Sequence, residues 1–448
     1  MASLASCLRR GHRILIQIQD RAGDVSLSGL QKIAGTQRVV TAEETLERAQ
    51  SVARALGVTR LANITGLDRV GIPTYSAVVP LSDDGISVYN GKGLREIDAK
   101  AGALMEAIER QTALKTRLPL IEGSFEQLSR QNIVLDPRKV IEKLSPDYSE
   151  QRVYSWVSGH DLISYREVLV PAKYAGYIWD DVPHPSCIDF VSTNGLSAGN
   201  VREEAISQGL CELIERDAWT LADIGAHLLP WVRARAVSAE AATNVLDDFE
   251  IFPCIDLEDD PVVELFERAG IHPVVRDITS DSGIPTVFVA AADETIPGYP
   301  MVHCGIGTHP DARVACRRAL TEMAQSRCVD IQGVREDVMP PDTPPTRYNL
   351  HTRRAREVNH RLWHLGRSKM RRKLGDLPSA VHSDIQSDID HILSRLHACG
   401  IYQAIVVDFT PPDAPFAVIR VIVPQLETWS LSHGRLGQRA LDFWHKHA

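Results

Sequence analysis

A pair of acidic or amide side chains at i, i+3 spacing recurs three times in this chain, at intervals of about a hundred residues, each time in an apolar helical pattern. The pairs are Glu106 with Glu109, Glu212 with Glu215, and Glu322 with Gln325. Residues three apart share one face of a helix, and two carboxylates there repel each other. The repeat therefore favours a fold in which three helices turn their acidic faces toward a cation, and it indicates a metal–nucleotide site.

The second of these segments, from about Arg202 to Ala222, shows the pattern most clearly. At about 100° per residue, Glu204, Gln208, Glu212 and Glu215 fall within roughly 80° of one another, and the apolar residues lie opposite. A solvated surface face is the usual alternative for such a stripe. Gln208 and Glu212, however, do not form the acid–base pair at i, i+4 that is typical of a solvated face, and the motif occurs three times.

Glycine-rich segments precede two of these helices. They are Asn90-Gly91-Lys92-Gly93 and the stretch from Ser192 to Asn200. Glycines let backbone N–H groups approach a phosphate, and a helix N-terminus and a lysine add positive charge. Neither segment matches the GxxxxGK[ST] or GxGxxG pattern, so a simple tight turn is the alternative. Together with the carboxylates, they predict a magnesium–triphosphate site.

The composition argues against a nucleic-acid-binding or membrane-spanning protein. The 448 residues are 44% hydrophobic and carry a formal net charge of -9, which gives no general attraction to nucleic acid or to an anionic membrane. No apolar run approaches the length needed to span a bilayer. The eight cysteines show no CxxC and no zinc-type cluster, so we expect a reduced, cytoplasmic protein.

Helical and strand periods alternate along the chain, which predicts an α/β or mixed α+β fold. Helices are expected at 41–56, 98–114, 202–222, 262–269 and 314–331, and strands at 13–18, 59–65, 74–79, 274–277, 286–291, 404–408 and 416–423. Thr41 and Glu44 form the capping-box pattern of a helix start.

Several blocks of the sequence resemble the YcaO family, and they occur in the family's order over roughly residues 51–337. The blocks are Gly57 to Arg60, Thr65 to Pro73, Gly91 to Gly93 with Glu106 and Glu109, Asn194 to Asn200 with Glu204 and Glu212 to Arg216, and Gly305 to His309 with Glu322 to Arg327. The resemblance implies an α/β fold peculiar to that family. It also implies that carboxylates on several helices bind ATP with Mg²⁺, and that ATP is used to phosphorylate a peptide amide oxygen.

The resemblance also implies roles for individual residues. Metal contacts are expected from Glu106, Glu109, Glu212, Glu215 and Glu322. The nucleotide site is expected to include Lys92, Asn200, Glu204, Gln208, Arg216 and Gln325. Gly102 stands where family members often carry serine. No catalytic residue is assigned, because no Ser-His-Asp or Cys-His arrangement stands out, and His303 and His309 are expected to be structural.

Three functions remain open. The run from Thr65 to Pro73 and the approach to Gly91 are similar to members that work with a TfuA-type partner, which favours thioamide installation on a ribosomally made precursor peptide or protein. Azoline-forming cyclodehydration is second, because members of that type commonly end in a proline-rich tail that this chain does not show. A non-catalytic scaffold that binds a precursor peptide or assists ribosome modification is third. A homodimer is plausible by the same resemblance.

We expect three regions: a variable lead-in over 1–50, an ATP-binding catalytic core over 51–337, and a proline-rich linker, basic segment and C-terminal strand and helix region over 338–448. The basic segment spans 353–373. The favoured interpretation of this segment is a solvated surface helix. The alternative is a contact surface for an acidic partner or leader peptide.

Overall fold

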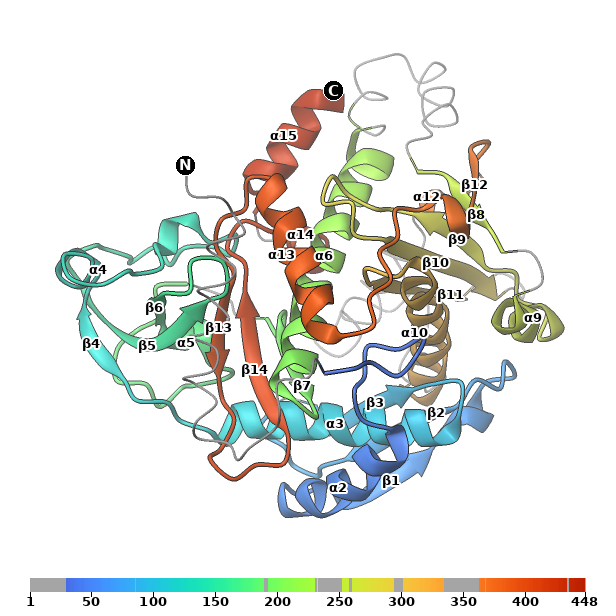
Figure 1. The fold of residues 1–448 in the computed structure, drawn as a ribbon, viewed down its shortest axis with the longest axis horizontal. Helices are drawn as coiled ribbons and strands as arrows, with labels where there is room; N and C mark the ends of the chain where they lie inside the picture. Colours follow the sequence, from blue (N-terminus) through green and yellow to red (C-terminus); the bar gives the residue numbers. More distant parts are fainter. Residues whose placement is uncertain are drawn as a thin grey trace, which may run out of the picture.

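A computed structural model describes residues 30–84, 86–188, 192–229, 232, 252–257, 260–293, 301–333, 362–366, 368–432 and 435–447. Their strands form three separate sheets, and a long central helix, α6 (Arg202–Asp223), lies between the two larger sheets (Figure 1). The fold is mixed α and β, as the alternating periods predict.

The smallest sheet has the antiparallel order β1-β2-β3, with β1 (Arg60–Asn63), β2 (Thr74–Val78) and β3 (Val88–Lys92). It packs against α3 (Glu96–Lys115), which also contacts α2 (Ala42–Ala55). The side chain of Thr41 accepts a hydrogen bond from the N–H of Glu44, so the expected helix start is confirmed.

The six-stranded sheet joins distant parts of the chain. Its order is β4-β5-β13-β14-β7, with β6 paired to β5. Its members are β4 (Ile121–Ser124), β5 (Val153–Asp161), β6 (Glu167–Pro171), β7 (Leu196–Gly199), β13 (Ile405–Asp408) and β14 (Ala417–Ile422). The two C-terminal strands therefore fill the middle of a sheet whose other strands lie more than two hundred residues earlier.

The third sheet has the order β11-β10-β9-β8-β12. Its strands are β8 (Cys254–Asp256), β9 (Val274–Asp277), β10 (Thr286–Asp293), β11 (Met301–Thr308) and β12 (Arg371–Lys373). One face is covered by α10 (Ala312–Gly333), which follows β11 directly.

Shorter elements complete the described chain. The helices are α4 (Phe125–Leu128), α5 (Ala172–Ala175), α9 (Pro261–Arg268), α12 (Leu362–Leu365), α13 (Ile385–Ala398), α14 (Trp429–Ser432) and α15 (Gln438–His447). Single turns are η1 (Thr65–Leu67), η2 (Pro137–Lys139) and η5 (Leu374–Asp376), and α6 continues into a π-helical turn, η3 (Ile224–Leu228).

One strand–helix unit occurs three times: β3 with α3, β7 with α6, and β11 with α10. In each unit a strand glycine lies against the backbone of the following helix. A Cβ on Gly91 would stand 2.1 Å from the N of Ala103, and one on Gly305 would stand 2.2 Å from the O of Ala319. At Gly199 the Cβ of Glu204 would be 2.6 Å away. Only glycine allows helix and strand to approach this closely.

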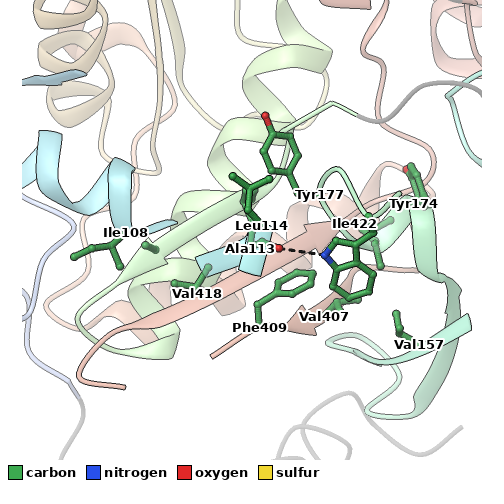
Figure 2. Close-up of a cluster of buried hydrophobic side chains, with 14 of the residues drawn as sticks. Ile108, Ala113, Leu114, Val157, Tyr174, Tyr177, Val407, Phe409, Val418 and Ile422 are labelled. Atoms are coloured by element: carbon green, nitrogen blue, oxygen red, sulfur yellow. Dashed lines mark hydrogen bonds between the residues drawn. The ribbon is translucent and has the colours of Figure 1, made fainter. Parts of the chain in front are cut away.

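The largest hydrophobic cluster lies between the six-stranded sheet and α3. Figure 2 labels Ile108 and Leu114 of α3, Val407 of β13 and Phe409, which follows β13, as members of this cluster. In the same cluster the indole N–H of Trp179 donates to the carbonyl of Ala113 over 3.2 Å. This packing fixes α3, and with it the first acid pair, against the C-terminal part of the chain.

Two local expectations are wrong. The Asn90-Gly91-Lys92 segment is part of β3 and is no turn, because its glycine serves close packing with α3. Residues 371–373 of the basic segment form β12, and Arg371 and Arg372 pair with Asp256 and Asp277, so they do not belong to a solvated helix. Residues 353–361 and the strand expected at 13–18 lie outside the described residues.

The described helices are each too short or too polar to traverse a bilayer. The division of the chain at residues 50 and 337 stays a prediction.

Candidate nucleotide and metal site

The three acid pairs lie at equivalent places on α3, α6 and α10. Counted from the start of each helix, the first member is residue 11 and the second is residue 14. Each helix follows its own strand and is held against it by a glycine contact, so equivalent helix positions come to equivalent places in space. Electrostatic coupling links Glu109 to Glu212, and Glu215 to Glu322, which places all three pairs in one group of side chains, named here the acid group.

On α6, Glu215 is a buried member of the acid group with an oxygen that has no hydrogen-bond partner. Its side chain is 4% exposed, its Oε1 is 3.4 Å from Nη1 of Arg216, and its Oε2 has no hydrogen-bond partner. Burial raises the pKa of Glu215 to about 8; Arg216 opposes this rise, whereas Glu322 and Glu212 add to it. Glu212 accepts from the backbone N–H of Gly195 over 3.2 Å and from Arg216 over 3.4 Å. Glu212 and Glu215 therefore share Arg216, and this one guanidinium does not offset the effect of burial on the pKa of Glu215.

On α10, Glu322 has a closer positive neighbour than Glu215 has. Nζ of Lys92 lies 2.8 Å from its Oε2. Burial opposes ionisation of Glu322, but Lys92 and Arg216 outweigh it and hold the pKa below its usual value. Gln325 donates weakly to the carbonyl of Asn90 over 3.4 Å. The third helix is thus tied to β3 of the first unit.

On α3, Glu106 accepts from the backbone N–H of Asn90 over 2.8 Å. Burial raises the pKa of Glu106. The pKa of Glu109 is raised well above its usual value by burial, and then by the nearby charges of Glu212 and Glu106, with Arg110 opposing. Two of the three helices therefore contribute carboxylates that resist ionisation without an added cation.

These features fit Mg²⁺ with a nucleotide. Five carboxylates of three helices are electrostatically coupled to one another or to Lys92 and Arg216, and one buried carboxylate oxygen is unpaired. Burial, together with repulsion from nearby carboxylates, raises the pKa values of Glu106, Glu109 and Glu215. Within the described residues, no three His, Cys, Asp or Glu side chains are arranged to hold a metal ion by themselves. Mg²⁺ usually takes one or two protein carboxylates and completes its shell with water and phosphate oxygens, so this arrangement suits a metal that arrives with its nucleotide.

The remaining predicted nucleotide residues lie together, next to the acid group but with different partners. Glu204 is fully buried, and it accepts from the backbone N–H groups of Val39 and Asn200 over 2.7 and 2.9 Å and from the guanidinium of Arg38 over 3.3 Å. The Nδ2 of Asn200 also donates to Glu204. This carboxylate is therefore already satisfied by the protein, unlike Glu215.

Gln208 connects α6 to α10 and to the N-terminal part of the described chain. Its Oε1 accepts from Nη1 of Arg318 over 2.7 Å and from the amide of Gln37. Sequence reasoning missed Gln37, Arg38 and Arg318. Arg318 stands four residues before Glu322 and could have been found by helical spacing. No local pattern points from Gln37 or Arg38 to α6.

The two histidines contact other groups. His303 is 3.0 Å from Asp330, and Nδ1 of His309 accepts from the backbone N–H of Asp311 over 2.9 Å. Both side chains are buried at about 1% exposure, and their carboxylate neighbours, Asp330 for His303 and Asp388 for His309, are not members of the acid group. The structural role expected for the two histidines stays a prediction.

The chain matches the family model described as YcaO cyclodehydratase, ATP- and Mg²⁺-binding, over residues 90–427. It is 34% identical to an uncharacterized protein of Methanothermobacter thermautotrophicus, over 83% of this chain and 90% of that one. It is also 31% identical to an uncharacterized protein in the tfuA 3' region of Rhizobium leguminosarum bv. trifolii, over 84% and 85% of the two chains.

Two solved structures share the fold. One is YcaO from Methanopyrus kandleri bound with AMPPCP and Mg²⁺, with a TM-score of 0.66 and 23% identity over 92% of this chain and 99% of that chain. The other is a heterocyclase in complex with substrate and cofactor, with a TM-score of 0.69 and 21% identity over 90% of this chain and 54% of that chain.

Proposed function

The chain belongs to the YcaO family, and from this premise we propose that it activates a peptide backbone amide by ATP-dependent phosphorylation of the amide oxygen. The family is ATP- and Mg²⁺-binding, so ATP and Mg²⁺ are its cofactors. The observation that supports the proposal is the acid group itself, in which carboxylates of three helices are electrostatically coupled and an oxygen of Glu215 has no hydrogen-bond partner.

The chemistry explains the need for ATP. An amide carbonyl is a poor electrophile and its oxygen a poor leaving group, so the adduct formed by an attacking nucleophile reverts. Phosphorylation of the adduct oxygen makes phosphate the leaving group. Catalysis of such a transfer depends mainly on positioning and on neutralisation of charge.

We assign these tasks to residues of the acid group. Glu106, Glu109, Glu212, Glu215 and Glu322 would hold the metal, which supplies positive charge to the phosphate oxygens when bound. Lys92 and Arg216 provide fixed positive charge beside Glu322 and Glu215. Asn200, Glu204, Gln208 and Gln325 border the nucleotide, with Glu204 held in place by Asn200 and Arg38.

We propose external sulfide as the nucleophile, and a thioamide as the product. Hydrosulfide adds to the amide carbon, the adduct oxygen takes the terminal phosphoryl group of ATP, and release of that oxygen as phosphate leaves C=S and ADP. The proton of hydrosulfide leaves with the phosphate. The relative in the tfuA 3' region, 31% identical to this chain, supports this choice and a TfuA-like partner protein.

Azoline formation is the alternative, because the family description is that of a cyclodehydratase and one structural neighbour is a heterocyclase. There a Cys, Ser or Thr of the peptide attacks its own backbone. The substrate in both cases is a precursor peptide or protein. We also propose that the protein forms a homodimer.

Mass spectrometry of the product separates the two reactions. With ATP, Mg²⁺, sulfide, partner protein and cognate peptide, we expect a product heavier by the difference between sulfur and oxygen. A product lighter by one water, formed without sulfide, would establish azoline formation instead. Release of phosphate from ATP accompanies both reactions and does not distinguish them.

A further inference from the structure

Arg420, on β14, is a buried cation without an ion-pair partner. The residue is 2% exposed, and among the described residues no carboxylate forms an ion pair with it, although the charges of Glu142 and Glu212 act on it from farther away. Its two terminal nitrogens donate to the backbone carbonyls of Gly176 and Ser192. Its Nε has no hydrogen-bond partner. Buried arginines are normally paired, because removal of a charge from water is unfavourable unless an opposite charge compensates it.

A small cavity of about 10 Å³ lies beside this guanidinium. Arg420, Asn194, Tyr174, Glu142, Leu213 and Ile422 are among the residues that line it. Tyr174 and Ile422 are labelled in Figure 2, at the edge of the hydrophobic cluster. The volume suits one water-sized species. The cavity is therefore too small for a nucleotide or a peptide side chain.

The polar atoms without partners in this cavity wall are donors. Nδ2 of Asn194, in a residue that is 5% exposed, has no hydrogen-bond partner, and neither has Nε of Arg420. The acceptor present, Glu142, already receives the hydroxyl of Tyr174 over 2.8 Å. Burial raises the pKa of Glu142, which favours its neutral form and reduces its repulsion of an anion. Two buried donors without partners, one of them on a guanidinium that forms no ion pair, favour an anion as the occupant of the cavity.

The cavity adjoins the acid group through two pairs of neighbouring residues. Asn194 precedes Gly195, whose N–H donates to Glu212, and Leu213 follows Glu212 on α6. The charge of Glu212 is also felt by Arg420. An anion in the cavity would therefore lie behind the metal ligands, on the side of α6 that faces β14.

We propose that this cavity is a binding site for one small monovalent anion, held by Nε of Arg420 and Nδ2 of Asn194, and that hydrosulfide is the anion it takes during turnover. The second half rests on the proposed thioamidation, and the first half does not. Chloride shares the charge and the small size of hydrosulfide, so it occupies the same site when sulfide is absent.

Bromide is the probe for the site, since it scatters anomalously and is close to hydrosulfide in size and charge. Crystals of the full chain soaked in sodium bromide should show an anomalous peak within hydrogen-bond distance of Arg420 Nε and Asn194 Nδ2. Addition of sodium sulfide should remove the peak. A feature at this place without anomalous signal would be a bound water and would overturn the proposal.

In the Asn194→Asp variant, a carboxylate of the protein takes the place of the bound anion in the cavity. In the wild-type protein, the melting temperature should be higher in sodium bromide than in sodium gluconate of equal ionic strength, because gluconate is too large to enter. Asn194→Asp should abolish this difference, and Asn194→Leu should reduce it. Ser155→Ala is the matched control, because Ser155 is also a buried polar residue without a partner but does not line the cavity, and it should keep the difference. Equal melting temperatures of the wild type in the two salts would contradict the site.

Kinetics test the assignment to hydrosulfide. Bromide should compete with sulfide, and Asn194→Asp should raise the KM for sulfide about tenfold or more while the KM for ATP stays unchanged, as expected when a hydrogen bond to a charged ligand is lost. Bromide binding without competition would overturn hydrosulfide as the occupant. If the product proves to be an azoline, thioamidation fails, and the bromide peak still decides whether the anion site exists.

Discussion

At the scale of single residues, Glu215 combines three properties that rarely meet in a structural side chain. It is buried, it has an oxygen without a partner, and its pKa is raised to about 8. Glu322 on α10 and Glu212 on α6 add negative charge, and the positive charges of Arg216 and Arg318 do not offset the effect of burial. The protein without a cation therefore favours the neutral acid, and a bound cation favours the carboxylate.

Glu215→Gln should abolish most Mg²⁺-dependent ATP turnover while the protein without metal keeps or increases its free energy of unfolding. Glutamine resembles the protonated acid in shape, but it cannot compensate a cation, and a charge of this kind contributes about 10²–10³ in rate. Turnover assays and urea denaturation measure the two effects. Glu203→Gln, at the start of the same helix, is the matched control. Equal activity of the Glu215 variant and the wild type would remove Glu215 from the site.

His309 predicts how stability depends on pH. Burial, with Arg318 and Lys32 adding positive charge, lowers the pKa of His309 to about 3. In the unfolded chain an imidazole titrates near about 6.5, so between these values the unfolded state binds a proton that the folded state does not. The resulting stability is fully present above about pH 6.5 and is lost as the pH falls toward 3, by up to about 1.4 kcal/mol per pH unit.

Urea denaturation at several pH values between 7 and 5 tests this dependence. His309→Asn retains an acceptor for the N–H of Asp311 and should flatten the curve, whereas His272→Asn, at an exposed position, should leave it unchanged. Asp388 and His382 lie in the same cluster and are present in both variants, so the comparison isolates His309. An equal slope in both variants would mean that His309 is protonated in the folded chain.

The sequence identified the acid group because helical spacing is local. The pairs at 106 and 109, at 212 and 215 and at 322 and 325 are visible without knowledge of tertiary structure. Angular reasoning also placed Gln208 and Glu204 on the face of Glu212 and Glu215. It could not show that Arg38 and Val39 satisfy Glu204, because those residues approach from a segment about 165 residues earlier.

At the scale of elements, close helix–strand contact determines where the acids point. Gly305→Ala should destabilise the protein by about 1–3 kcal/mol or more, because its Cβ would lie 2.2 Å from the carbonyl of Ala319, on the packed face of α10. The shift of α10 should also separate Glu322 from Lys92 and reduce ATP turnover. Gly333→Ala, at the end of α10 with nothing within 4 Å of its Cβ, should be neutral or slightly stabilising. Chemical denaturation of both variants checks the contrast.

The strand β12 changes the expectation for the basic segment. Arg372 lies 2.8 Å from Asp277, whose other oxygen accepts the N–H of Thr279. Arg372→Gln should therefore lower the free energy of unfolding by about 1 kcal/mol, a modest amount because the arginine is half exposed. Lys373→Gln, next on the strand, is the control. If the Arg372 variant is as stable as the wild type, the ion pair does not stabilise the fold, and a role of Arg372 in partner binding is favoured.

The ends of helices were largely predictable where the sequence shows a capping residue or a clear helical periodicity of apolar residues. The helices that carry the acids begin and end within about two residues of the predicted bounds. The prediction for the glycine-rich segments was wrong in its structural reason. Gly91 and Gly199 were expected in anion-binding segments, and in the structure they allow a strand to pack closely against the following helix. Sequence alone does not distinguish these uses, because both depend on the absence of a Cβ.

At the scale of the whole molecule, β13 and β14 hold the six-stranded sheet together. β13 pairs with β5, and β14 pairs with β7, so the sheet divides in two without them. A chain that ends at residue 403 should show no cooperative unfolding transition by calorimetry. A chain that ends at residue 434, which lacks only α15 among the described elements, should retain one. Cooperative unfolding of the shorter chain would show that the sheet is not a single unit.

Strand order in this sheet was not predictable, because pairing between residues more than two hundred apart leaves no local pattern. It has a consequence during synthesis. The ribosome releases β5 and β7 early, with their edges unpaired, and β13 and β14 come last. Until then the nascent chain exposes two apolar strand edges of the kind that aggregate. We therefore expect this protein to depend on chaperones while it is being translated, and we expect synthesis that stalls before β13 to yield insoluble chains.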